Sequence, residues 1–429
     1  MRRLIITMLA ATVIGLTGSC ATHRLAQPAE PTQPAEQPTE QPDQPAEQPA
    51  EQPAEESAEP AQPTPEELVA KVVASMSLEE KLGAMIIAGV DGTKASAAAR
   101  RMIERQHVGG VIFYGNNVKT PQSVAAYVNQ LRAWNKSNKS PLLVTVDEEG
   151  GRVSRLPGLV KLPSGRAVGD TGDRSYAEEI GGLLGQASKS MGFNVDFAPV
   201  LDINSNPNNP VIGDRSYGAT AKVVTSMGVA VMEGLKAEGV IPVVKHFPGH
   251  GDTSVDSHLE LPVVNKSLAQ LKSFEWVPFN SAIEKGADAV MIAHILFPKI
   301  DKSVPASLSR TIITDQLRGE LGFKGVVMTD DLTMGAIAKN YGMGEAAVLT
   351  VKAGSDILLV AHKYENVDAI LAALMNSVTR GEIAEERIDE SVKRILMLKE
   401  TYGLSDAKTP SVPDLSALND DIRKAEARH

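Results

Sequence analysis

Short apolar runs alternate with longer amphipathic stretches along most of the chain. Eight such runs, rich in aliphatic and β-branched residues, occupy positions 84–89, 110–113, 142–146, 195–200, 240–244, 289–292, 325–328 and 357–360. Runs of this length and composition are typical of strands that are buried on both faces of a sheet. Segments with helical spacing lie between them, among them 123–136, 177–189, 221–237 and 268–284. The alternation predicts parallel βα units.

The number of these units favours a barrel over an open sheet. Eight units within positions 66–404 predict a single α/β domain, a (β/α)8 barrel of the TIM type. An open doubly wound sheet is expected to carry a Gly-rich nucleotide-binding loop after its first strand, and the sequence shows none. Apolar residues at helical spacing from Ile388 to Leu404 predict a final helix packed on the barrel. Positions 405–429 are expected to form a C-terminal tail.

The first twenty residues have the pattern of an export signal. Arg2 and Arg3 precede an apolar run at 4–16, too short to span a bilayer as a helix, and small residues then lead to Cys20. This order predicts a bacterial lipoprotein signal with lipid attached to Cys20, the only cysteine of the chain. An ordinary signal peptide cleaved nearby is the alternative. Both interpretations predict export, and lipidation predicts a membrane anchor on the extracytoplasmic side.

Positions 21–65 have the composition of a disordered linker. From Gln27 to Pro65 the tetrapeptide Gln-Pro-Ala-Glu repeats with little variation, and the segment carries nine acidic residues and no basic one. Such a sequence cannot bury a core, and dense proline favours an extended, semi-rigid spacer. The linker contributes most of the formal net charge of −10. Because the rest is only mildly acidic and has no Lys/Arg-rich run, nucleic acid is not expected as a partner.

Charged side chains collect directly after five of the eight predicted strands. They are Asp147 to Arg152 after the third, Asp202 after the fourth, Lys245 and His246 after the fifth, His294 after the sixth, and Asp330 with Asp331 after the seventh. Each alone is compatible with a solvated loop or a helix N-cap. Together they lie at the end of a barrel where active sites form, so they predict a catalytic pocket.

The segment after the fifth strand is the richest in ionisable groups. It reads Lys245-His246-Phe247-Pro248-Gly249-His250-Gly251-Asp252 and is followed by Asp256-Ser257-His258. Proline and glycine at this density exclude a regular helix, so the segment is predicted to be a loop. Small polar residues from Gly249 to Ser257 lead us to expect that this loop moves and closes over a ligand.

With these residues the chain resembles the bacterial β-N-acetylglucosaminidases of glycoside hydrolase family 3. The similarity covers nearly the whole barrel and runs through Ser77 to Gly83, Asp147 to Arg155, Gly213 to Tyr217, Lys245 to Gly251 with Asp256 to His258, Pro305 to Ser309, and Gly325 to Met334. One departure is Glu148, where many relatives have Gln. The resemblance implies a retaining exo-β-N-acetylglucosaminidase that removes non-reducing terminal N-acetylglucosamine from cell-wall muropeptides or chitin oligosaccharides.

The resemblance also implies the catalytic roles. Asp330 is the expected nucleophile, and Asp331 beside it is interpreted as a structural carboxylate that caps amides. His258 is the expected proton donor, with Asp256 accepting from its other ring nitrogen. A carboxylate on one imidazole nitrogen fixes the tautomer and raises the pKa, which suits an acid that later acts as a base.

The resemblance to the same family also implies roles for the remaining site residues, each at a position that matches the family's motifs. Asp147, Arg155, Arg215, Lys245 and His246 are expected to bind hydroxyls of the terminal sugar through charge-assisted hydrogen bonds. His250 and Asp252 are interpreted as loop scaffold. No metal and no cofactor are expected. The partners are the oligosaccharide substrate and, through the lipid, a membrane, and the protein is expected to be a monomer.

Three alternatives differ in function class. A phosphorylase on the same scaffold stays open, because a histidine repels incoming phosphate less than a carboxylate would. A metal-dependent hydrolase would use His246, His250, Asp252, Asp256 and His258 as zinc ligands, but Pro248 and Gly249 break helical His-x3-His geometry. A non-catalytic sugar-binding lipoprotein would leave the expected nucleophile without a role.

Overall fold

The computed structural model describes residues 63–409 and 412–429 and contains one parallel eight-stranded sheet. Its strands are β1 (Ile86–Gly89), β2 (Gly110–Phe113), β3 (Leu143–Val146), β4 (Val195–Asp196), β5 (Ile241–Phe247), β6 (Ala289–Ile292), β7 (Val326–Thr329) and β8 (Leu358–Val360). The hydrogen-bonded order is β7-β6-β5-β4-β3-β2-β1-β8. A parallel bridge from Met328 to Ile357 joins the two ends. The sheet is therefore a nearly closed barrel, and the predicted (β/α)8 fold is confirmed.

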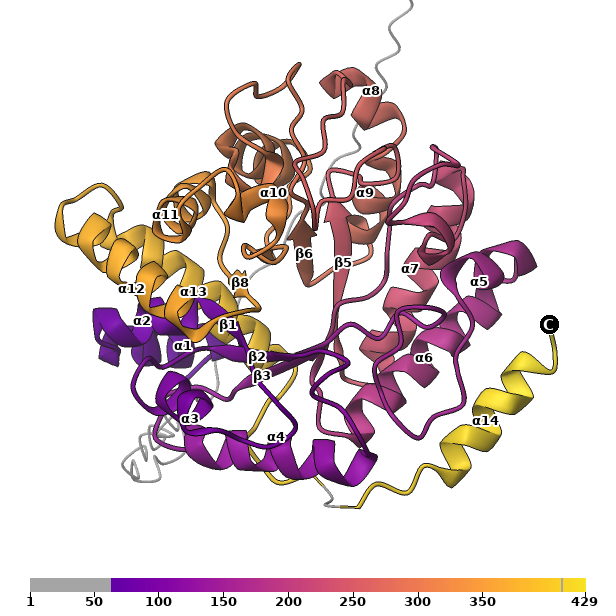
Figure 1. Cartoon of the computed structure of the whole chain (residues 1–429), viewed down its shortest axis with the longest axis horizontal. Coiled ribbons are helices and arrows are strands. Elements are labelled where there is room, and N and C mark those ends of the chain that lie inside the picture. The colour runs from indigo at the N-terminus through magenta and orange to yellow at the C-terminus, as the bar shows by residue number, and fades with distance from the viewer. Residues whose placement is uncertain (1–62, 410–411) are drawn as a thin grey trace, which may run out of the picture. The chain divides into compact units, whose positions relative to one another are not determined.

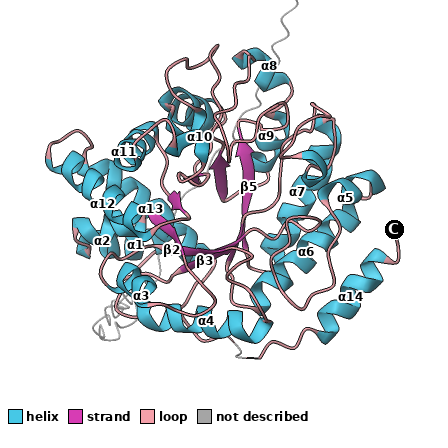
Figure 2. Cartoon of the chain, in the orientation of Figure 1, coloured by secondary structure: helices cyan, strands magenta, loops and turns pink. Residues whose placement is uncertain are grey.

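Helices surround the strands, as Figure 1 and Figure 2 show. They are α1 (Pro65–Ser75), α2 (Leu78–Ala84), α3 (Ala97–Glu104), α4 (Pro121–Asn135), α5 (Gly165–Thr171), α6 (Arg174–Ser190), α7 (Ala221–Ala237), α8 (Leu268–Ser273), α9 (Val277–Glu284), α10 (Gly335–Ala338), α11 (Met343–Ala353), α12 (Tyr364–Thr379), α13 (Glu385–Thr401) and α14 (Ser416–Glu426). Three further helical segments are η1 (Gly213–Arg215), η2 (Ala306–Leu308) and the π-helical η3 (Thr311–Glu320).

The strands form where the sequence is continuously apolar because both of their faces are covered. Every residue of β2, β3, β5, β6, β7 and β8 is buried. Local signals fix the helix starts. At α2, for example, the Ser77 hydroxyl accepts from the Glu80 amide, and the Glu80 carboxylate accepts from the Ser77 amide. This capping box satisfies two amides that a helix start leaves free.

Three predicted elements differ from the structure. The fifth strand extends to Phe247, so Lys245 and His246, which were predicted to begin the loop, belong to β5. The fourth strand ends at Asp196 rather than at 200. The Phe197 amide still donates to Val146, and beyond Pro199, which has no N–H to donate, the pairing is reduced to a single bridge from Val200 to Lys245. The helix predicted at 268–284 is divided into α8 and α9, and Pro278 occupies the first turn of α9, where a missing N–H costs no helical hydrogen bond.

The C-terminal region contains more structure than the sequence predicted. The closing helix is confirmed as α13, which packs on α1 and α2. The segment predicted only as a tail contains α14, which packs on α6 (Figure 1). The amphipathic pattern of α14 includes the buried residues Leu418, Ile422 and Ala425 at helical spacing, which is the signal that would have identified it.

The predicted signal at 1–20, including Cys20, and the linker up to position 62 lie outside the described residues. Within the described part of the chain, no helix is both long and apolar enough to cross a membrane.

Candidate active site

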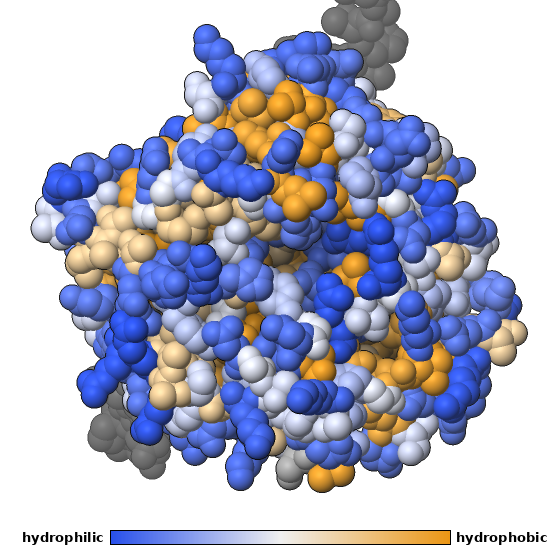
Figure 3. Space-filling view, in the orientation of Figure 1, coloured by the Kyte–Doolittle hydropathy of each residue, from blue (hydrophilic) through white to orange (hydrophobic). Residues whose placement is uncertain are grey.

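A polar cavity of about 310 Å³ lies at the carboxyl ends of the strands. The space-filling view shows a hollow near the middle of this face with hydrophilic residues at its border (Figure 3). Eight residues proposed from the sequence line this one cavity: Asp147, Arg155, Arg215, Lys245, His246, Asp256, His258 and Asp330. The structure therefore brings together side chains that are up to 183 positions apart in the chain, counted from Asp147 to Asp330.

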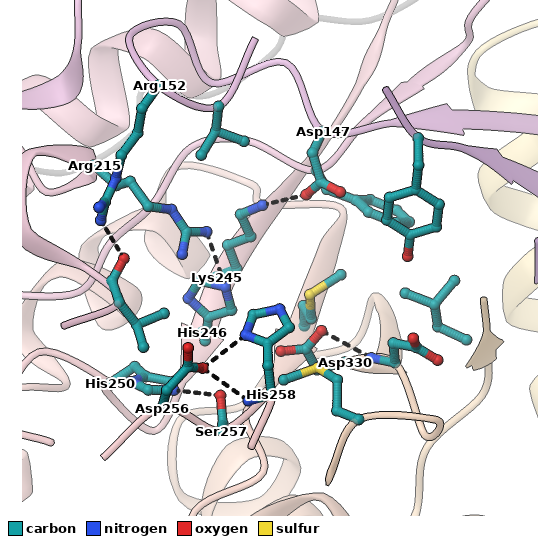
Figure 4. Close-up of a pocket in the computed structure, with 18 of the residues that line it drawn as sticks. Asp147, Arg152, Arg215, Lys245, His246, His250, Asp256, Ser257, His258 and Asp330 are labelled. Atoms are coloured by element: carbon teal, nitrogen blue, oxygen red, sulfur yellow. Dashed lines mark hydrogen bonds and ion pairs between the residues drawn. The ribbon is translucent and has the colours of Figure 1, made fainter. Parts of the chain in front are cut away.

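Asp330 follows β7 directly and faces the cavity (Figure 4). Its backbone amide donates to the Ile292 carbonyl of β6, which fixes the residue to the barrel rim. Burial opposes ionisation of the carboxyl, but the nearby His246 and His294 outweigh that effect and lower the pKa of Asp330 below its usual value. Asp330 is therefore a carboxylate at neutral pH, the form that a nucleophile requires.

Asp331 has a different environment from its neighbour. Its carboxylate accepts from the Thr333 amide at 2.9 Å, from the Thr333 hydroxyl at 2.6 Å, and from the Ala361 amide beyond β8 at 3.0 Å. These bonds hold the turn after β7 against the end of β8. The helix α10 that follows has no side-chain cap, so the amides that Asp331 binds belong to the turn and to the residue after β8 rather than to a helix start.

His258 and Asp256 form a hydrogen-bonded pair at the cavity rim (Figure 4). The Asp256 Oδ1 atom lies 2.8 Å from His258 Nδ1 and also accepts from the His258 amide at 2.8 Å. Burial would raise the pKa of Asp256, but its contacts with His258 lower it. The arrangement leaves Nε2 as the ring nitrogen available to a ligand. The His258 side chain is 63% exposed, so this pair is the accessible part of the site.

A buried ion network forms the floor of the cavity. Lys245 Nζ lies 2.6 Å from Asp147 Oδ1 and 2.6 Å from Glu149 Oε1. Arg215 binds both oxygens of Glu149, at 2.8 and 2.7 Å. Burial disfavours the ammonium of Lys245, yet Asp147 and Glu149 raise its pKa. Burial likewise disfavours the Glu149 carboxylate, and the two cations lower its pKa strongly. Burial also opposes the charge on Arg215, but Glu149 raises its pKa, so Lys245, Glu149 and Arg215 are all charged at neutral pH.

Two carboxylates of this region were noted in the sequence without a role. Glu149 connects Arg215 to Lys245, as described above, and Asp202 holds His246. Asp202 Oδ2 lies 2.6 Å from His246 Nδ1, so the ring is oriented with Nε2 near Arg215. Burial raises the pKa of Asp202, but His246 lowers it by more. The signal for both roles was present, because each carboxylate closely follows a predicted strand, but the side-chain directions come only from the fold.

Glu148 does not face the cavity. Its carboxylate is buried and accepts from the Ser154 hydroxyl at 2.6 Å and from the Arg155 and Leu156 amides at 2.6 and 2.9 Å. Burial raises its pKa. The residue therefore shapes the loop that carries Arg155, whose side chain lines the cavity and whose Nε is buried without a partner in the described residues.

Tyr114, which follows β2, is a cavity residue that the sequence analysis missed. Its ring stacks on His362 with centroids 5.5 Å apart. Burial, followed by the carboxylates of Asp331 and Asp147, raises the pKa of Tyr114 well above its usual value. The phenol is thus a neutral hydrogen-bond donor at the wall of the site. A lone tyrosine after a strand gives no sequence signal that separates this position from an ordinary packing residue.

His250 and Asp252 hold the loop that carries the Asp256–His258 pair. The two ring nitrogens of His250 lie 2.9 Å from the Thr253 hydroxyl and 3.0 Å from the Ser257 hydroxyl, and its amide donates to Asp202 at 2.6 Å. Asp252 forms an ion pair with Lys266 at 2.9 Å. Among the described residues, no group of three or more His, Cys, Asp or Glu side chains is arranged to hold a metal ion.

The burial of His250 predicts a specific acid sensitivity of the fold. Burial, followed by repulsion from His246, lowers the pKa of His250 to about 4 from 6.5. Between these values the unfolded chain binds a proton that the folded chain does not, so the unfolding free energy falls as the pH decreases. We expect this residue alone to cost about 2 kcal/mol between pH 7 and pH 5.

Urea unfolding of the wild type and of His250→Gln at both pH values measures this term. The amide retains hydrogen-bonding groups but does not titrate, so the variant is expected to lose less stability on acidification. An identical pH dependence in the two proteins would show that His250 is not held neutral in the folded state.

Comparisons with known proteins agree with this geometry. Residues 77–398 match the model of the glycosyl hydrolase family 3 N-terminal domain. A β-hexosaminidase from Thiobacillus denitrificans is 35% identical over 79% of this chain and 91% of its own length. β-Hexosaminidase A from Pseudoalteromonas piscicida is 33% identical over 76% of this chain, which spans 58% of that relative. A solved structure, a glycoside hydrolase family 3 β-N-acetylglucosaminidase from Paenibacillus sp., superposes with a TM-score of 0.77 at 43% identity, over 82% of this chain and 68% of that one.

Proposed function

The chain belongs to glycosyl hydrolase family 3 and is a glycoside hydrolase of the β-N-acetylhexosaminidase type, and on this basis we propose that it is a retaining exo-β-N-acetylglucosaminidase. The observation that carries the proposal is the ionised Asp330 in the same cavity as the Asp256–His258 pair. Retaining hydrolysis needs a nucleophilic carboxylate and a separate proton donor, and these residues supply both.

The first step forms a covalent glycosyl-enzyme. A carboxylate oxygen of Asp330 attacks the anomeric carbon, the bond from that carbon to the leaving oxygen breaks, and the leaving oxygen takes a proton from His258 Nε2. Asp256 stabilises the ring that gives this proton and later takes another from water. The second step uses His258 as a base on water, which attacks the same carbon and releases Asp330. Two inversions return the sugar with its original β configuration.

The charged floor is proposed to hold one terminal sugar. Lys245 is paired with Asp147, and Glu149 pairs with both Lys245 and Arg215. These side chains are therefore already fixed and offer oriented donors and acceptors to vicinal hydroxyls without reorganisation. Arg155 and His246 complete the set of proposed sugar ligands. A cavity of about 310 Å³ suits a single sugar ring rather than a long polymer, which supports exo action on short chains.

The test is hydrolysis of 4-nitrophenyl N-acetyl-β-glucosaminide followed by proton NMR. The first-formed N-acetylglucosamine is expected as the β anomer. Initial release of the α anomer would reject a retaining mechanism, and absence of hydrolysis would favour a sugar-binding lipoprotein. The same reaction with added inorganic phosphate tests the alternative phosphorylase, which is favoured by a histidine rather than a carboxylate as proton donor. Accumulation of N-acetylglucosamine 1-phosphate would establish that alternative.

The natural substrate is proposed from the predicted export of the protein. An enzyme outside the cytoplasmic membrane meets cell-wall fragments, so muropeptides with terminal N-acetylglucosamine are the first candidate and chitin oligosaccharides are the second. Comparison of kcat/KM for N-acetylglucosaminyl-N-acetylmuramyl peptides and chitobiose separates them. We further propose that the enzyme acts as a monomer with no metal or cofactor.

Anchoring is proposed to depend on Cys20 alone. Residues 1–20 are the signal, 21–65 the linker, 66–404 the catalytic barrel and 405–429 the C-terminal segment. Cys20→Ser is expected to release the protein from the membrane fraction without changing kcat/KM, because stable anchoring requires the added acyl chains. Fractionation of cells that produce the wild type or the variant measures this. A variant that stays in the membrane fraction would contradict the lipoprotein assignment.

A further inference from the structure

The loop that carries His258 is bound to the segment that carries Asp330 through main-chain hydrogen bonds. The amide of Gly335, the first residue of α10, donates to the His258 carbonyl at 3.0 Å, and the Ala336 amide donates to the Ser257 carbonyl at 3.1 Å. Gly335 lies five positions after Asp330. The proposed nucleophile and the proposed proton donor are therefore connected by two hydrogen bonds that involve no side chain.

The contact requires glycine at position 335 because there is no room for a side chain, and not because of its backbone conformation. A Cβ atom there would lie 2.6 Å from the His258 carbonyl oxygen and 2.5 Å from the Leu259 carbonyl oxygen. Both distances are far below an ordinary carbon–oxygen contact. Gly335 is not among the glycines with positive φ, so alanine fits its local conformation. Any side chain at 335 must instead push two backbone segments apart.

A side chain at position 335 is expected to displace the loop that carries His258 rather than the segment that carries the nucleophile Asp330. The turn after β7 is fixed by the bonds from Asp331 to Thr333 and Ala361 and by His294 Nε2, which lies 3.0 Å from the Asp331 carbonyl. Ile337 of α10 is fully buried. The opposite partner is much freer, because the side chain of His258 is 63% exposed and Leu259 is 61% exposed.

We propose that Gly335 is a positioning residue that sets the distance between the proton donor His258 and the nucleophile Asp330. The inference rests on the proposed function, because it presupposes that His258 gives a proton to the leaving oxygen. A side chain at 335 would move His258 outward while Asp330, the sugar ligands and the barrel stay in place. Misplacement of a catalytic group by about 1 Å can cost 10²-fold in rate, which is the size of the effect at issue.

The test is Gly335→Ala measured with two N-acetylglucosaminides that differ only in leaving group. For chitobiose, whose leaving oxygen needs a proton, kcat/KM is expected to fall about 10- to 100-fold. For the 2,4-dinitrophenyl glycoside, which leaves unaided, kcat/KM is expected to be nearly unchanged. The control is Gly342→Ala, because Gly342 precedes α11 at φ −68° and a Cβ there meets nothing within 4 Å. This variant should resemble the wild type with both substrates.

His258→Ala, measured with the same two substrates, separates the proposed role of His258 as proton donor from the proposed positioning role of Gly335. If His258→Ala shows no dependence on leaving group, the proposed proton donor is wrong. If His258→Ala shows the dependence and Gly335→Ala does not, only the positioning role is wrong. Equal losses for both substrates in Gly335→Ala would also reject that role, since they indicate damage to the fold or to Asp330.

Hydrogen exchange on the unaltered protein tests the contact without any variant. The Gly335 and Ala336 amides are expected to exchange more slowly than solvent-exposed loop amides, because both are bonded to carbonyls of the loop. Rapid exchange of these two amides would show that the loop is not held there and would reject the inference even if Gly335→Ala failed to fold.

Discussion

Asp330→Ala is expected to lower kcat for an aryl N-acetylglucosaminide by several orders of magnitude while the fold is retained. The carboxylate faces the cavity and makes one hydrogen bond to a backbone amide, that of Asp331 at 2.8 Å, so its removal leaves the barrel core intact. Steady-state kinetics and a urea unfolding curve measure the two parts of the prediction. Added azide should restore turnover in this variant by attacking the sugar directly, which gives the α-glycosyl azide through a single inversion.

Asp331→Ala is the matched control at the adjacent position. Its carboxylate satisfies the amides of Thr333 and Ala361, and unsatisfied buried amides cost about 1–3 kcal/mol each. We therefore expect a clear loss of stability, with activity reduced less than in Asp330→Ala. If Asp330→Ala kept near-native turnover and Asp331→Ala did not, the two roles would have to be exchanged.

The barrel was predictable from sequence because its strands are buried on both faces. Each strand is a short run of aliphatic residues between polar segments, and that signal does not depend on tertiary detail. The deviations were the early end of β4 before Pro199, the extension of β5 to Phe247, and the division of the helix predicted at 268–284 just before Pro278. The helix α14 was missed because a short segment after the closing helix was interpreted by its position and not by its apolar spacing.

The candidate site was predictable to a different degree for each kind of residue. The positions after the strands follow from the barrel alone, and the structure places all eight proposed residues in one cavity. Their catalytic and binding roles came from the family resemblance and stay predictions. Sequence did not distinguish carboxylates that face a ligand from those that face a cation. Glu149 and Asp202 are of the second kind, since each neutralises or orients a neighbour.

Coupling between loops was the least predictable feature. The hydrogen bonds from Gly335 and Ala336 to the His258 loop join segments almost 80 positions apart and involve only main-chain atoms. No side-chain pattern reports such a contact. A glycine with ordinary φ gives no sequence signal either, because its role depends on which backbone passes within reach of its missing Cβ.

His258→Ala is expected to lower activity most for substrates whose leaving oxygen is basic and must be protonated before it can depart. For chitobiose, the loss in kcat/KM should be roughly 10²- to 10⁴-fold, the usual contribution of general acid–base catalysis. For a good aryl leaving group, formation of the glycosyl-enzyme should slow only modestly. Its hydrolysis should slow more, because water then lacks a base.

Azide distinguishes a missing base from a damaged site in this variant. Azide needs no base, so it should restore aryl-glycoside turnover in His258→Ala by attacking the glycosyl-enzyme, and two inversions predict the β-glycosyl azide rather than the α product expected for Asp330→Ala. Asp256→Ala should change rates in the same direction by less, because Asp256 orients the ring at 2.8 Å and carries no proton itself. Equal losses for both substrates in His258→Ala, without rescue by azide, would mean that His258 only shapes the loop and that the proton comes from another group.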